Sequence, residues 1–281
     1  MFSSEYLDKN KLKTYFIQFR DTILTNSDAV IFIRKNKLWE GFWRYGWVAK
    51  ALVIMAIFLG LKFLQTIVDW WNTTEADDPV EVAASVGHLF QDIAFEGYDF
   101  LFVGGMKYVM MMLLEVVIFH MVRGTLEKLT GQTSDMSFQA FFNAQIRMIK
   151  VSIRSYIMEI LFGIVIAIVF SLAFGFGFLK PVVKYIVHCY FLGFIVLDNY
   201  AEQYNYSIKD SVHIARDYIG VALALGLTAN VLLLIPVIGV IIAPVIVAVT
   251  VTLVMYHISD LHQQPEIATE TIPETDQIRE S

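Results

Sequence analysis

The sequence predicts an all-α integral membrane protein that ends in a proline-broken helical hairpin. Hydrophobic residues make up 57% of the 281 residues and charged residues only 17%, a balance that exceeds that of an ordinary soluble domain. The apolar residues are also gathered into runs long enough for membrane passes. We expect an amphipathic interfacial segment over 1–45, a helical membrane domain over 46–260 and an acidic disordered tail over 261–281.

The N-terminal segment is predicted to lie at the membrane surface. Trp39, Trp43 and Trp47 follow at four-residue spacing, which places three indoles on one face of a helix. Tryptophan prefers the headgroup level, so this stretch indicates an interfacial helix. The alternative is the amphipathic helix of a soluble domain.

The next segments predict two crossings on either side of an acidic loop. The run 47–68 crosses only if Lys50 and Lys62 extend toward the headgroups. Residues 69–99 contain acids but no lysine or arginine, so we expect a non-cytoplasmic loop. The run 100–122 is marginal, because its apolar residues contribute roughly −5 kcal/mol and Lys107 with Glu115 cost roughly +5 to +6 kcal/mol.

A basic loop and the clearest single span follow. Residues 123–154 are net basic and predict a cytoplasmic loop. The stretch 160–179 is free of charge and would make about 30 Å of helix, which matches a hydrocarbon core. Its small residues recur every four positions and favour a helix-packing ridge over a binding groove. That ridge consists of Gly163, Ala167, Ser171 and Gly175.

The C-terminal part predicts one more apolar stretch and a hairpin. The apolar stretch 185–197 precedes a polar segment, 198–217, that we place inside the cell. The stretch 218–259 has no acid, lysine or arginine, and as one straight helix it would be about 63 Å long. No bilayer core is that thick, so we expect two helices that fold back between Pro236 and Pro244. Both chain ends are then cytoplasmic.

No motif for catalysis, metal, cofactor or nucleic acid is present, so we expect neither an enzyme nor a cofactor-binding protein. The six histidines never fall at ligand spacing with another histidine or a cysteine. We interpret His120 and His188 as hydrogen-bonded interior residues and Cys189 as a packing residue. No basic patch interleaved with aromatic residues points to nucleic acid.

The most unusual feature is a series of ionisable residues in and around the run 100–122. Asp99, Lys107, Glu115 and Arg123 alternate in sign at eight-residue spacing, about 12 Å apart along a helix and about 80° around it. Neighbours in the series therefore cannot pair directly. They either line a polar pathway or form interhelical ion pairs. Candidate partners for Lys107 and Glu115 are Glu159, Lys62 and Asn230.

Three segments carry a resemblance to a known family. They are LEKLTGQ at 126–132, FIVLDNYAEQYNYSIKDS at 194–211 and GLTANVLLLIPVIGVIIAP at 226–244. Over about 15–259 the chain resembles the etoposide-induced-protein family, whose bacterial members include the CysZ-type sulfate permeases. The resemblance implies fully crossing and partly penetrating helices, an oligomer and the bacterial inner membrane.

Two departures bear on the substrate that the resemblance implies. The permeases carry a proline and an asparagine just before the segment equivalent to LEKLTG, where this chain reads EVVIFHMVRGT. They also place an asparagine in the hairpin where this chain has Gly239.

Two functions are compatible with these observations. The first is a channel-like permease for a small anion such as sulfate, with Lys107, Arg123 and the hairpin around Asn230 and Gly239 attracting the anion and Glu115 gating or balancing it. The second is a non-transporting interaction or assembly subunit of the membrane, which would bind partner membrane subunits. The expected partners are the lipid bilayer, a small anion, and further copies of the chain or other membrane subunits.

Overall fold

The computed structural model describes residues 11–40, 106–131, 138–172, 177–233, 235 and 238–261, and every regular element among them is helical. The elements are α1 (Lys11–Asn36), α4 (Met106–Thr130), α5 (Phe138–Leu172), the 3₁₀ turn η2 (Gly177–Leu179), α6 (Lys180–Glu202), α7 (Ile208–Asp217), α8 (Ile219–Leu233) and α9 (Ile238–Ile258). The predicted run 47–68, the acidic loop 69–99, Trp43, Trp47 and the tail after residue 261 lie outside the described residues.

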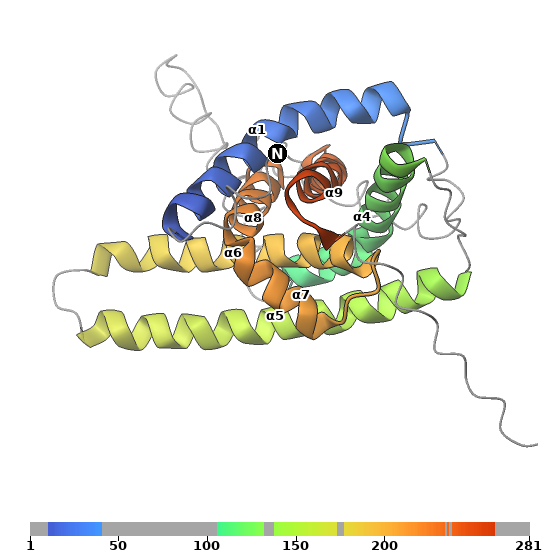
Figure 1. The fold of residues 1–281 in the computed structure, drawn as a ribbon. Coiled ribbons are helices and arrows are strands. Elements are labelled where there is room, and N and C mark those ends of the chain that lie inside the picture. The colour runs from blue at the N-terminus through green and yellow to red at the C-terminus, as the bar shows by residue number, and fades with distance from the viewer. Residues whose placement is uncertain are drawn as a thin grey trace, which may run out of the picture.

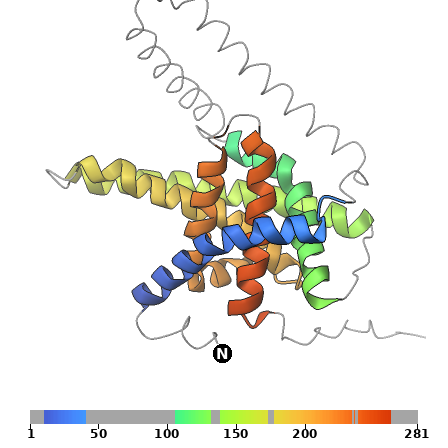
Figure 2. The same ribbon diagram turned by 90° about the horizontal axis from the view of Figure 1, so that it is seen from above.

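The helices pack in three layers (Figure 1). The antiparallel pair α5 and α6 forms one layer, α4, α8 and α9 form the middle layer, and α1 crosses over α8 and α9 (Figure 2). The core lies where α6 packs against the middle layer, and its fully enclosed residues include Ile195 of α6, Val221 and Leu225 of α8, and Val251 of α9. The far end of the α5–α6 pair extends beyond the other helices (Figure 1).

Among the described residues, three helices are long and apolar enough to cross a membrane, as the composition predicts. They are Asn143–Leu172 in α5, Lys180–Glu202 and Ile241–Ile258 in α9. The bent pair α7 and α8, which turns by 95° at Tyr218, would make a fourth span if it crosses as one unit. The all-α membrane fold predicted from the sequence is confirmed.

The predicted loop 123–154 and the predicted span 160–179 require correction. The basic stretch 123–154 is mostly helical and not a loop, because α4 continues to Thr130 and α5 begins at Phe138. Gly131, with a φ of 71°, ends α4 in the left-handed conformation that glycine adopts most easily. The predicted span 160–179 in turn ends early, since α5 stops at Leu172 and η2 follows. The membrane helix is therefore displaced toward the N-terminus.

The predicted C-terminal hairpin is present, with a tighter turn. Helix α8 ends at Leu233 and α9 begins at Ile238, so Pro244 lies inside α9 and does not mark the turn. The turn closes through Gly239, whose backbone N–H donates to the Ile235 carbonyl at 2.9 Å. A Cβ at Gly239 would come within 2.0 Å of the Leu232 carbonyl oxygen, so only glycine permits this close approach.

Helix α1 is held to the bundle through buried amides. Gln18 donates to the Asp217 carbonyl at 3.0 Å and accepts from the Gly220 N–H at 3.2 Å, which satisfies two backbone groups at the bend between α7 and α8. Asn26 donates to the Thr228 hydroxyl and accepts from Thr250, both at 2.9 Å. Helix α1 is thus fixed to α8 and α9. Its predicted place at the membrane surface stays a prediction.

The closest helix contact lies between α6 and α8. A Cβ at Gly193 would come within 1.8 Å of the Ala222 carbonyl oxygen, and one at Gly226 within 1.8 Å of the Cys189 carbonyl oxygen. The predicted small-residue ridge does not serve this purpose within the chain, because a Cβ at Gly163 would meet no atom of the described residues within 4 Å. Small residues bring α6 and α8 together instead.

Candidate functional site

A buried polar cluster joins α5, α6 and α7 around Arg147. Its guanidinium donates to both carboxylate oxygens of Asp198, at 3.0 Å from Nε and 2.7 Å from Nη2. It also donates to the Ser211 hydroxyl at 2.9 Å and to the Tyr206 carbonyl. Glu202 lies 3.8 Å from Nε. This bidentate arrangement orients one cation against two carboxylates in the interior.

Glu115 lies beside this cluster, at the contact of α4 with α6. Its side chain is fully buried, and Asn199 donates to Oε2 at 3.0 Å. Asn199 directly follows Asp198, so the two residues connect the Glu115 carboxyl to the Arg147 cluster. No donor of the described residues reaches Glu115 Oε1, and the Asn199 Oδ1 atom is likewise buried without a hydrogen-bond partner there.

The phenols next to the cluster contribute no charge. Tyr206 lies in the connection between α6 and α7, where burial raises the pKa of its hydroxyl above the ordinary value. The nearby Asp210 carboxylate acts in the same direction. The Tyr206 phenol therefore stays neutral at physiological pH, while its backbone carbonyl accepts from Arg147.

A second polar cluster lies nearer the start of α6. His188 approaches Glu159 of α5 at 3.3 Å through Nδ1 and Asn230 of α8 at 3.0 Å through Nε2. The Asn230 amide also donates to the Gly226 carbonyl at 2.9 Å and to the Cys189 sulfur at 3.5 Å. The expectation that His188 is a hydrogen-bonded interior residue and Cys189 a buried packing residue is confirmed. His120 likewise contacts a backbone carbonyl, that of Leu38, at 3.0 Å.

The two clusters lie along one face of α6. His188 and Asn199 are eleven positions apart, which is close to three full turns of an α-helix, and Glu202 follows one turn later. Two apolar turns, which include the buried Leu192 and Ile195, separate the clusters. A candidate transmembrane helix therefore carries buried polar groups at two levels, both turned toward the bundle.

The predicted site residues are distributed over this arrangement. Glu115 and Asn230 belong to the first and second clusters, and Gly239 forms the hairpin turn. Arg123 is buried on α4, with its guanidinium 5.8 Å from the Phe119 ring centre and 3.8 Å from a Glu127 oxygen. Lys107 belongs to α4, but its side chain lies outside the described residues. The partner found for Glu115 is Asn199, whereas the proposed partners Glu159 and Asn230 contact His188.

Sequence reasoning missed Arg147, Asp198 and Asn199. The sequence alone places Arg147 in a predicted basic loop and the segment after Leu197 in a predicted polar connection. For Asn199, a signal was present in the helical period: Asn199 and Glu202 fall on the same face of a helix as His188.

The described residues contain no group of three or more histidine, cysteine, aspartate or glutamate side chains arranged to hold a metal ion. Neither the curated proteins nor the solved structures include a significant match to the chain. The sequence model of the family described as sulfate transporter CysZ/etoposide-induced protein 2.4 matches residues 25–244. That match covers most of the chain, and its description agrees with the resemblance drawn from the C-terminal segments and with the membrane helices of the fold. The protein is thus a member of the sulfate transporter CysZ/etoposide-induced protein 2.4 family.

Proposed function

We propose that the chain is a permease for a small anion such as sulfate, and that the polar face of α6 marks the path. The observation that carries the proposal is the placement of His188, Asn199 and Glu202 on the inward face of a candidate transmembrane helix. Polar groups at membrane depth are costly, and they usually mark a pathway for an ion or a substrate. The family description supplies the class of substrate.

The donors needed by an anion are available along this face. The side-chain amides of Asn199 and Asn230, the His188 ring and the Arg147 guanidinium can all donate hydrogen bonds. In the described conformation, Arg147 is held by Asp198 and the two amides bond to neighbouring acceptors. An anion can pass only if these donors leave their present acceptors and bond to the anion instead. The described conformation therefore corresponds to a closed state, which opens by helix movement.

The alternative, a non-transporting membrane interaction or assembly subunit, is favoured by the enclosure of Glu115. The Glu115 side chain is fully buried and hydrogen-bonded to Asn199, so it does not line water in this conformation. A carboxyl enclosed in this way stabilises a helix contact and does not by itself require a transported ion.

Uptake of labelled sulfate into proteoliposomes separates the two functions. We expect faster uptake than in protein-free vesicles, and a reduced rate for Asn199→Leu at unchanged protein content. An exposed substitution on α7, Lys209→Gln, is the matched control and should leave uptake unchanged. Uptake equal to that of empty vesicles, with protein that still melts cooperatively, would contradict the transport proposal and favour the assembly subunit.

A further inference from the structure

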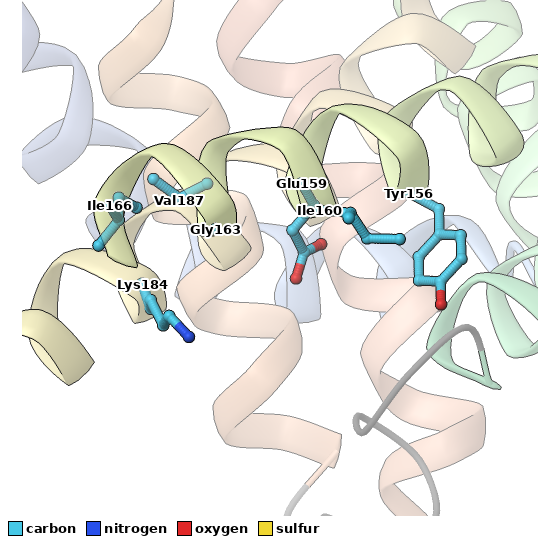
Figure 3. A pocket seen from close by; sticks show the side chains of 7 residues that line it. All are labelled: Tyr156, Glu159, Ile160, Gly163, Ile166, Lys184 and Val187. Atoms are coloured by element: carbon cyan, nitrogen blue, oxygen red, sulfur yellow. The ribbon is translucent and has the colours of Figure 1, made fainter. Parts of the chain in front are cut away.

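A cavity of about 230 Å³ lies between α5 and α6, apart from the Arg147 cluster (Figure 3). Tyr156, Glu159, Ile160, Gly163 and Ile166 line it from α5, and Lys184 and Val187 line it from α6. The Glu159 carboxylate and the Lys184 side chain project into the same space (Figure 3). The cavity thus combines one acid, one base and one phenol with an apolar wall.

The surroundings of this cavity are apolar on the outside of the bundle. Exposed residues next to it include Ile157 and Ile164 on α5 and Val182 and Ile186 on α6. Both helices are candidate membrane spans, so this side faces lipid. An occupant that enters from this side comes from the bilayer.

The two charges restrict the chemistry of the occupant. No ion pair within 4.0 Å among the described residues includes Lys184, although the Glu159 carboxylate lines the same cavity. Glu159 is oriented by His188 at 3.3 Å and keeps part of its side chain exposed toward the cavity. A ligand that matches both groups carries an anionic oxygen group and a cationic nitrogen a short distance apart.

We propose that this cavity binds the headgroup of a phospholipid with a primary ammonium, of the phosphatidylethanolamine type. The phosphate accepts from Lys184, the ammonium donates to Glu159, and the acyl chains lie along the apolar outer faces of α5 and α6. The opening at Gly163, where a Cβ would meet no atom of the described residues within 4 Å, gives the headgroup room.

The quaternary ammonium of phosphatidylcholine fits this cavity less well than a primary ammonium does. Such a group cannot donate a hydrogen bond to Glu159, and it is bound by several aromatic rings arranged as a cage. Tyr156 is the one aromatic residue among those that line the cavity. An anionic lipid without an amine satisfies Lys184 but leaves Glu159 facing a phosphate.

The test is lipid retention by the full chain, measured by native mass spectrometry after delipidation. Phosphatidylethanolamine, phosphatidylcholine and phosphatidylglycerol with identical acyl chains are added back separately, without sulfate. We expect about tenfold stronger retention of phosphatidylethanolamine, since one charge-assisted hydrogen bond distinguishes it. Lys184→Met and Glu159→Gln should each abolish the preference, whereas Lys180→Met, one turn earlier on α6 and outside the cavity, should preserve it.

Several outcomes would overturn the proposal. They are equal retention of phosphatidylethanolamine and phosphatidylcholine, retention of phosphatidylglycerol as strong as that of phosphatidylethanolamine, or a preference that survives both substitutions. A lipid-free dimer that crosslinks through cysteines placed at position 163 would assign the cavity to a second copy of the chain. Melting temperatures of the variants show that lost binding is not lost folding. Because sulfate is absent, none of these results depends on the transport proposal.

Discussion

The guanidinium of Arg147 holds both carboxylate oxygens of Asp198, at 2.7 and 3.0 Å, and thereby joins α5 to α6 across 51 positions of sequence. Both side chains are largely buried, so each is a costly group to leave alone. Asp198→Leu should lower the free energy of unfolding by about 3–5 kcal/mol, because the Arg147 charge then stays in the interior without its main partner. Denaturant unfolding in detergent, followed by circular dichroism, measures the loss.

The control for this prediction is the double variant. Arg147→Met combined with Asp198→Leu removes both charges, and it should cost less than the sum of the two single substitutions. Strictly additive losses would show that the pair contributes no coupling energy.

The same pair shows why the sequence predicts the helices better than the site. The apolar stretch 185–197 is visible in a local window, and the structure confirms a helix there. Its continuation to Glu202 carries Asp198, which pairs with Arg147 in a different helix, and the charge around Arg147 predicts a loop there. A positive charge count predicts the side of the membrane, but it does not identify which arginine turns inward to meet a carboxylate.

Helix packing illustrates the same limit. A repeat of small residues on α5 is easy to recognise, yet the close contact forms through Gly193 and Gly226, which lie on different helices. Which small residues meet is a property of the tertiary arrangement. The hairpin can be predicted because a proline and the limited thickness of the bilayer core act on a short stretch of sequence. The position of Pro244 inside α9 cannot be predicted in this way.

The contact between α6 and α8 should be sensitive to a single methyl group. Gly193→Ala and Gly226→Ala each place a Cβ 1.8 Å from a backbone carbonyl oxygen of the other helix, so the helices must separate. We expect each to lower the free energy of unfolding by about 1–3 kcal/mol or more. Gly163→Ala is the matched control, since its Cβ meets nothing within 4 Å and alanine favours the helix. Equal melting temperatures for all three variants would refute the close contact.

Gln18 should be required for the bend between α7 and α8. Gln18→Leu leaves the Asp217 carbonyl and the Gly220 N–H without the partner that the side chain supplies. Each unsatisfied group costs about 1–3 kcal/mol when it stays buried. Asn36→Ala is the control, because its amide donates to the Phe32 carbonyl within α1 at 3.0 Å and makes no hydrogen bond to another helix of the described residues. Hydrogen exchange at the Gly220 amide should accelerate in the Gln18 variant and not in the control; unchanged exchange in both would contradict the role of Gln18.

Glu115 offers the clearest separation of charge from hydrogen bonding. Its carboxyl is fully buried, Asn199 donates to Oε2, and Oε1 has no donor among the described residues. Glu115→Gln keeps an acceptor for Asn199 and removes a group whose ionised form is costly to bury. We expect it to melt at or above the temperature of the parent protein. Glu115→Leu removes the acceptor and should cost about 1–3 kcal/mol, as an interior structural role requires.

Thermal melting of both Glu115 variants is compared with their sulfate uptake in proteoliposomes. If Glu115→Gln folds normally but loses uptake, the carboxyl takes part in transport, as the sequence-based hypothesis of a gating residue states. If Glu115→Gln melts as low as Glu115→Leu, the charge itself supports the fold, and the expectation that an uncharged acceptor for Asn199 is sufficient is wrong.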